Sequence, residues 1–370
     1  MCTRETSSLP PMNMFPFSWI LRPSDAKQIS LNPVDSCFQG VVGACGISVL
    51  CNLMRLYHFT QTCRGGVFFF GVFIFSALRD RENDDSRQRL PLSGSPLRKW
   101  RRAGQFWCLV MLLSLVGPRV SSLIVLEFCL RAVSAWASAG PDKHGRGLNL
   151  LLIQCQFSLG CSLTCILDFL HQGALHSSLS LLLAAALSWM LASVVDSLWV
   201  HVAQLYQLHS TQRNCGKCIT LLTSGHAILA SLQSVVILAF ALGIVASTNT
   251  VSDHFLSHKD ALKFWTPLTL CYTVLLFYIQ EEQNQQTGLE ALLHYVALRL
   301  GALLVLMLTV GEWTDVLHVL IAFLGEAACV LPSQDLLQSV LEEEEDEEVL
   351  EESNFTTRER RRKPSPEDGQ

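Results

Sequence analysis

The chain has 370 residues, of which 50% are apolar and only 16% are charged, whereas about a quarter of an ordinary globular chain is charged. Its mean hydropathy is positive, at +0.33. This composition excludes a disordered protein and a small disulfide-stapled domain, and it predicts an all-α polytopic membrane protein. The net charge of −5 is unevenly distributed, because residues 341–370 hold 12 acidic and 5 basic groups. The remaining chain is only slightly basic, which argues against a nucleic-acid partner.

Apolar segments of sufficient length recur along most of the chain. A membrane-crossing helix needs about 20 largely uncharged residues, because the hydrocarbon core is roughly 30 Å thick and cannot hydrogen-bond the backbone. A further apolar run, Gly65–Leu78, is 14 residues long and therefore reads as an interfacial or re-entrant piece. We predict eight crossings, at residues 38–54, 106–130, 148–170, 179–200, 219–247, 262–279, 291–310 and 316–331.

These spans divide the chain into three parts. Residues 1–37 form a loosely ordered lead with five prolines, residues 38–331 form the membrane domain, and residues 332–370 form an acidic, disordered tail. A basic loop, residues 57–105, separates the first two spans and contains the apolar run, which we interpret as an insertion at 64–77.

Orientation follows from the distribution of lysine and arginine. Ten basic residues lie between Arg55 and Arg102, so the positive-inside rule places this loop in the cytosol. Eight crossings would then put both termini on the opposite side. Asn354 begins the only Asn-x-Ser/Thr sequon and would be a glycosylation site if the tail were lumenal.

Several charged side chains fall inside predicted spans, where each costs a few kcal/mol and needs a partner or a function. Arg119 directly follows Gly117-Pro118, which predicts a kink because proline removes an amide donor and clashes with the preceding turn. Two interpretations stay open. The charges either line a polar cavity for an ion or small solute, or they form buried pairs, such as Glu127 with Arg131 and Arg299 with Glu326.

The third span carries two amides, Gln154 and Gln156, followed by small residues. Ser158 and Ser162 share one helix face, and the first span has a similar group of glycines at 40, 43 and 46. Small residues at such spacing let two helices approach closely. Tight packing is the predicted role, with the two glutamines as further candidates for lining a polar site.

Fourteen cysteines are present, and most of them lie within predicted spans, where cysteine behaves as a small apolar residue. Cys215 and Cys218 form the one Cys-x-x-Cys motif, with His209 and His226 as the nearest further metal ligands. A lone motif of this kind is weak evidence, so we predict neither a metal nor a cofactor. The sequence contains no P-loop, nucleophile elbow, dinucleotide fingerprint or zincin motif, and we expect no enzymatic activity.

Several stretches together resemble the transmembrane protein 82 family. They include "QGVVGACGISVL", "SSLIVLEFCLRAVS", "CQFSLGCSLTC", "LYQLHSTQRNCGKC", "FWTPLTLCYTVLLFYIQEEQ" and "LLVLMLTVGEWTD", in this order from about Gln39 to Val330. The resemblance implies a multi-pass α-helical membrane protein and brings no catalytic residue or ligand with it. The acidic tail and the segment 64–77 depart from the family pattern. The second of these has the composition of translated intron sequence.

Two functions are consistent with these features. The first is a carrier of a small solute or ion, with Arg119, Glu127, Arg299 and Glu326 converging near the midplane. The second is a membrane adaptor or assembly protein that contacts protein partners through residues 205–218 and through its acidic tail. A carrier requires charges that face a shared cavity, whereas an adaptor requires charges that are neutralised in packed seams.

Overall fold

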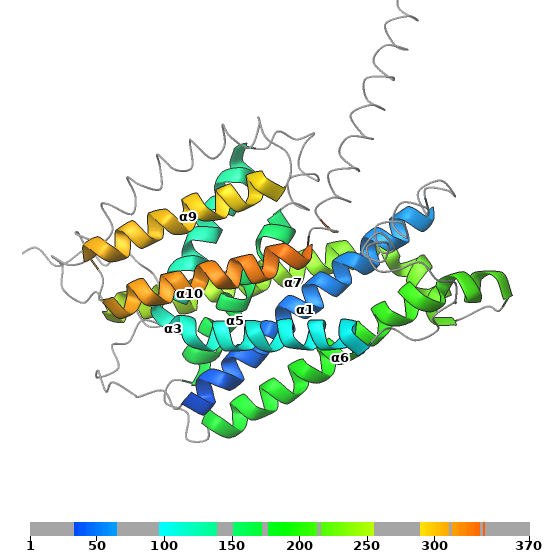
Figure 1. The fold of residues 1–370 in the computed structure, drawn as a ribbon, viewed down its shortest axis with the longest axis horizontal. Helices are drawn as coiled ribbons and strands as arrows, with labels where there is room; N and C mark the ends of the chain where they lie inside the picture. Colours follow the sequence, from blue (N-terminus) through cyan, green and yellow to red (C-terminus); the bar gives the residue numbers. More distant parts are fainter. Residues whose placement is uncertain are drawn as a thin grey trace, which may run out of the picture.

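The computed structural model describes residues 33–64, 96–138, 151–171, 177–212, 216–254, 289–310, 313–333 and 336. Every regular element in these ranges is helical, which confirms the predicted all-α class (Figure 1). The elements are α1 (Pro33–Arg64), α3 (Pro96–Ser138), α5 (Gln156–His171), α6 (Ser177–Gln212), α7 (Gly216–His254), α9 (Leu289–Val310), α10 (Trp313–Val330) and the short 3-10 helix η2 (Leu331–Ser333).

Proline defines three of the helix ends. Pro33 and Pro96 occupy the first positions of α1 and α3, where the missing N–H has no intrahelical role, and Asp35 adds a favourable negative charge to the first turn of α1. Helix α10 gives way to η2 just before Pro332, because a residue that precedes proline is disfavoured in the α conformation.

Five described helical stretches are long and apolar enough to cross a membrane, and they coincide with the first, second, fourth, fifth and eighth predicted spans. The third and seventh predicted spans correspond to α5 and α9. The sixth, 262–279, and the apolar run 65–78 lie outside the described residues. The five stretches are Pro33–Gln61, Arg102–Ser134, Ser178–Ala203, Ala227–Val251 and Val316–Ser333.

Burial differs strongly among these helices. In α3, 56% of the most apolar window is buried inside the protein, against 22% in both α6 and α7. The outer faces of α6 and α7 carry exposed Leu183, Leu187, Ile237 and Leu242. Acyl chains solvate such side chains as well as a protein core does, so these two helices form the lipid-facing side of the bundle.

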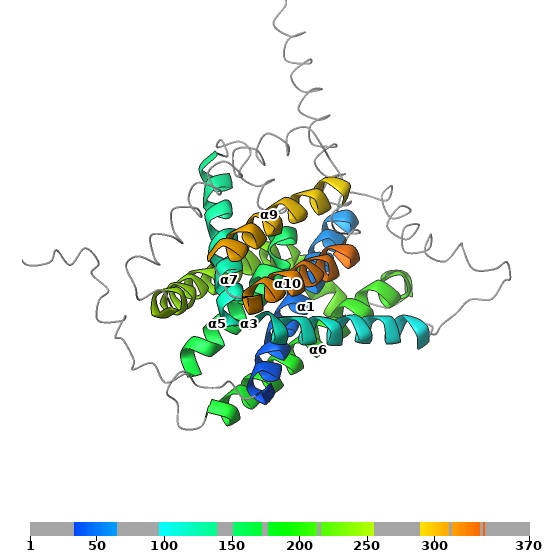
Figure 2. The ribbon, with the colours of Figure 1, turned by 60° about the vertical axis from the view of Figure 1, so that its left-hand side comes forward.

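Helix α5 occupies the interior of the bundle, where α1, α3, α7 and α10 surround it (Figures 1 and 2). Small residues allow this close packing, as predicted. A Cβ atom on Gly43 would lie 3.0 Å from the carbonyl oxygen of Gly160, and one on Gly243 would collide with Ser162 Oγ. The Ser162 hydroxyl donates a hydrogen bond to the Ala239 carbonyl across the same α5–α7 seam (3.0 Å).

A second, smaller apolar cluster joins α1 and α6 beyond the predicted spans. Leu56 and Phe59 of α1 pack with Val202 of α6, and all three are buried. The predicted first span ended at Met54 and the fourth at Val200, because polar residues follow both. Both helices nevertheless continue, because the apolar side chains beyond Met54 and Val200 pack against each other and are buried.

Two side-chain hydrogen bonds show the relative directions of α1, α3 and α10. Arg55, near the end of α1, donates to the Pro332 carbonyl beyond α10 (2.9 Å), and Gln105, near the start of α3, donates to the Ala328 carbonyl of α10 (3.2 Å). The end of α1, the start of α3 and the end of α10 therefore meet at one end of the bundle. We call this the near end.

The second half of α3 and α5 form an antiparallel pair. Ser122 lies against Cys165 (3.6 Å), and Arg131 donates to Gln154 (2.7 Å), so the residue order along the two helices is opposed. Helix α1 begins at the opposite, far end of the bundle, whereas α10 finishes at the near end.

The seam between α1 and α3 gives a direct test of tight packing. A Cβ atom on Gly40 would lie 2.6 Å from the Val110 carbonyl oxygen and would overlap Ser114 Oγ. Because the carbonyl belongs to the backbone and cannot rotate away, we expect Gly40→Ala to lower the stability of the detergent-solubilised protein by about 1–3 kcal/mol. Gly104→Ala, where nothing lies within 4 Å of the added atom, serves as the control and leaves the melting temperature unchanged or higher. Equal melting temperatures of the two variants would contradict tight packing in this seam.

The helix directions also predict the sidedness of the chain. A tag inserted after residue 90 and a tag at the C-terminus should be accessible from the same side of the membrane, and an N-terminal tag from the opposite side. Antibody access after selective permeabilisation of the plasma membrane measures this. Asn354 lies outside the described residues, and the C-terminal tag reports the side on which the chain continues beyond α10. If that side is cytosolic, enzymatic deglycosylation leaves the mobility of the protein unchanged. Access to the N- and C-terminal tags from one side would refute the arrangement.

Candidate functional site

The kink predicted in the second span is present in the middle of α3. Gly117 has a φ of 74° and a ψ of 158°, outside helical geometry and in a region that favours glycine, and Pro118 follows it. Ser122 Oγ donates to the Pro118 carbonyl (2.7 Å), and a Cβ atom on Gly117 would meet the His318 ring of α10 at 3.3 Å. Arg119 lies half-buried directly after the kink. The kink thus sets the direction of the half of α3 that carries Glu127.

A buried charged pair begins about three turns beyond the kink. Glu127 Oε1 is 3.7 Å from Arg131 Nε, with side-chain exposures of 3% and 5%. This is the i, i+4 pair predicted from the sequence. Arg131 Nη1 also donates to Gln154 Oε1 (2.7 Å), and its guanidinium group lies 4.9 Å from the centre of the Phe128 ring. The pair therefore ties α3 to the segment that leads into α5.

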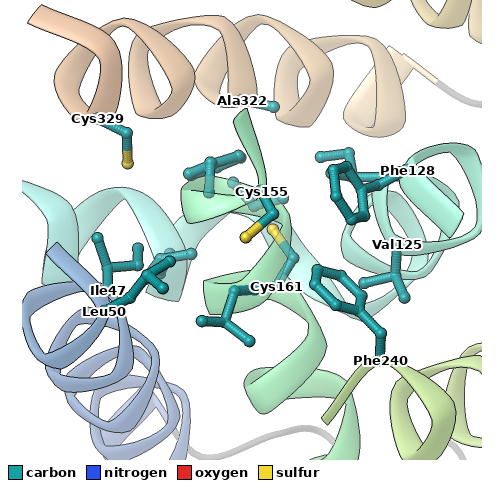
Figure 3. Close-up of a cluster of buried hydrophobic side chains, with 14 of the residues drawn as sticks. Ile47, Leu50, Val125, Phe128, Cys155, Cys161, Phe240, Ala322 and Cys329 are labelled. Atoms are coloured by element: carbon teal, nitrogen blue, oxygen red, sulfur yellow. The ribbon is translucent and has the colours of Figure 1, made fainter. Parts of the chain in front are cut away.

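Apolar side chains enclose this pair. The Phe128 ring stacks on Phe240 of α7, with 4.6 Å between ring centres, and Val125 packs in the same cluster (Figure 3). Charge–charge attraction is stronger in such low-dielectric surroundings, and so is the cost of leaving either group alone.

A second polar contact lies at the start of α5. Gln156 Nε2 donates to Ser333 Oγ (2.8 Å), whose hydroxyl donates to the Cys329 carbonyl (3.0 Å). The Cys51 thiol of α1 donates to Gln156 Oε1 (3.2 Å). One side-chain amide thus links α1, α5 and the end of α10. The sequence predicted Gln156 but not its partners, because Cys51 and Ser333 are small residues without any motif.

Cys155 lies between the two polar contacts. It occupies a turn between the helical residues 151–154 and α5, and it lies within electrostatic range of Arg131, Glu326 and Cys51. Figure 3 places it between α10 and the α3 half that carries Phe128. Glu326 itself is 2% exposed. Gly325 before it has no room for a side chain, because a Cβ atom would overlap the Phe157 ring of α5.

The predicted site residues thus fall into two groups. Glu127 and Gln154 meet through Arg131, whereas Gln156 and Glu326 lie along α5 and α10 around Cys155. Arg119 lies in the same half of α3 as Glu127 but eight residues before it, roughly 12 Å away along the helix. Arg299 belongs to α9, but its side chain is outside the described residues, so its pairing with Glu326 stays a prediction.

The metal-like motif stays untested. Cys215 and the side chains of Cys218, His209 and His226 lie outside the described residues. Nine cysteines whose side chains are described are free thiols, and six of them are buried. This matches their predicted role as small apolar residues. Within the described part of the chain, no group of three or more metal-ligating side chains is close enough to hold an ion.

Five long apolar helices, a lipid-facing side and buried polar contacts define a multi-pass α-helical membrane protein. The family model described as Transmembrane protein 82 matches residues 34–351, most of the chain. The chain therefore belongs to the transmembrane protein 82 family, as the sequence resemblance predicted. The match extends through the acidic run to residue 351, whereas the resemblance covered the chain only to about Val330. No solved structure matches the chain.

The buried pair predicts a specific pattern of stabilities. Glu127→Gln removes the carboxylate beside a buried guanidinium group and should destabilise the protein by about 3–5 kcal/mol, whereas the double variant Glu127→Leu/Arg131→Met should recover most of this loss. Thermal unfolding in detergent measures both. Asp196→Asn is the control, because Asp196 pairs with Arg102 at 3.8 Å in an exposed setting, where such pairs contribute less than about 1 kcal/mol. A double variant less stable than Glu127→Gln would contradict the prediction.

Proposed function

We propose that the protein carries a small solute or ion through the membrane, and that the buried polar groups around Cys155 form its binding region. The observation that supports this most is that two interrupted helices bring charged and amide side chains into one interior region. Helix α3 is broken at Gly117, and the helical segment before α5 is interrupted at Cys155. Discontinuous helices with buried polar groups are a recurrent arrangement in carriers.

The chemistry of the region suits a polar cargo. Arg131 and Glu127 supply opposite charges, and Gln154 and Gln156 supply amides that can both donate and accept hydrogen bonds. A cargo that enters must replace the contacts that these side chains make with one another. Intramembrane ionisable groups are costly, which is why they usually mark a functional site.

The alternative function is that of a membrane adaptor or assembly protein. One observation favours it: Glu127 and Arg131 neutralise each other in a packed seam and hydrogen-bond to Gln154. In that case the buried groups fix how the helices pack, and residues 205–218 together with the acidic tail contact the partner.

Uptake into proteoliposomes separates the two functions. The purified full-length protein is reconstituted and assayed with a broad panel of labelled ions, amino acids, carboxylates and sugars. For a carrier we expect time-dependent uptake of at least one compound, reduced at least tenfold by Glu326→Gln and by Gln156→Leu, because both change buried groups of the proposed region. Asp196→Asn, at the exposed pair, is the control and should retain full uptake.

Two results would count against the carrier. One is a folded, reconstituted protein that transports no member of the panel. The other is uptake that the Glu326 and Gln156 variants leave unchanged while they fold normally, because the buried polar groups would then have no part in transport.

A further inference from the structure

The described side chains at the start of α3, at the near end of the bundle, are exposed. Trp100 is 79% exposed, Arg102 and Ala103 are exposed, and nothing lies within 4 Å of a Cβ atom placed on Gly104. Four of the five residues 98–102 are basic, as the sequence "RKWRR" shows. These turns, residues 96–104, are called the basic turns below.

The basic turns are electrostatically unfavourable on their own. The N-terminus of a helix carries a partial positive charge, which acidic side chains in the first turn normally offset. The first turn of α3 has no acidic residue, and basic residues follow instead. Asp196 of α6 lies 3.8 Å from Arg102 and offsets the charge of that residue. This surface therefore calls for an anionic partner.

The same chain contains an anionic segment that is tethered close to the basic turns. Gln105, one turn after the basic turns, donates to the Ala328 carbonyl near the end of α10 (3.2 Å). Leu336, eight residues further, is buried in the main core, so the chain is still held there. Only five residues separate Leu336 from residues 342–352, of which nine of eleven are acidic. Such a linker spans at most about 20 Å, and short tethers give effective concentrations in the millimolar range.

We propose that the acidic segment 342–352 docks on the basic turns of α3 in the same chain. Its carboxylates balance the four basic residues and the partial positive charge at the helix N-terminus. The contact follows from charge complementarity, from the exposed helix surface and from the short tether between them. It is independent of whether the protein is a carrier or an adaptor. Anionic phospholipids are the competing occupant, because basic residues beside a membrane span attract them.

Zero-length crosslinking tests this contact in the full-length protein. A carbodiimide joins a lysine amine to a carboxylate only when the two touch, and Lys99 is the one lysine in the basic turns. In neutral detergent micelles at low salt, we expect peptides that link Lys99 to residues 342–352. The yield should fall severalfold at about 1 M salt, where the screening length is only about 3 Å.

Two variants separate docking from chance encounter. The triple variant Arg98→Glu/Arg101→Glu/Arg102→Glu keeps Lys99 and the tail, and it should lower the yield at least fivefold. The matched control, Arg87→Glu/Arg89→Glu, changes basic residues of the same loop outside α3 and should leave the yield unchanged. Crosslinks from Lys363 report that the reagent is active.

Three results would overturn the proposal. The first is the absence of the Lys99 product while Lys363 still reacts. The second is a yield that charge reversal in α3 does not change. The third is a product that forms in phosphatidylcholine nanodiscs and disappears when phosphatidylserine is added, since lipid would then be the occupant in an anionic membrane.

Discussion

Hydrocarbon offers no hydrogen bonds, and this constraint governs how the polar side chains of the bundle are arranged. Arg131 cannot be hydrated where it lies, so it takes its contacts from Glu127 on its own helix and from Gln154 before α5. Gln156 likewise bonds to Ser333 and receives the Cys51 thiol. The bonds of Arg131 to Gln154 and of Gln156 to Ser333 and Cys51 join separate helical segments, so polar bonding and helix packing specify the same arrangement. Transmembrane helices gain little from the hydrophobic effect when they associate, and such bonds therefore matter for their pairing.

The sequence predicted those features that depend on neighbouring residues. The kink follows from Gly117-Pro118, the buried pair follows from the spacing of Glu127 and Arg131, and α10 coincides with the predicted span 316–331. The helical class follows from composition, because hydrocarbon admits helices whose backbones bond internally. The close approach of α1 and α5 was also predictable in kind, since glycines and serines recur at the spacing of one helix face.

Features that depend on the path of the chain in space were not predictable. Nothing in the sequence marks Ser333 as the partner of Gln156, since the two are 177 residues apart and serine is common. The antiparallel pairing of the second half of α3 with α5 depends on the angle of the kink, which a Gly-Pro dipeptide does not specify. The continuation of α1 and α6 was not predictable either, because the sequence does not show that Leu56 and Val202 pack together.

The left-handed conformation at Gly117 has a mechanical consequence. A continuous helix transmits bending along its ladder of backbone hydrogen bonds, and at this residue the ladder of α3 is interrupted. The two halves of α3 are thus separate rods that share a pivot, and the His318 ring rests against it. The first half of α3 is hydrogen-bonded to α10 through Gln105, and the second half is hydrogen-bonded through Arg131 to Gln154, just before α5. One half of α3 can therefore tilt while the hydrogen bond that holds the other half stays in place.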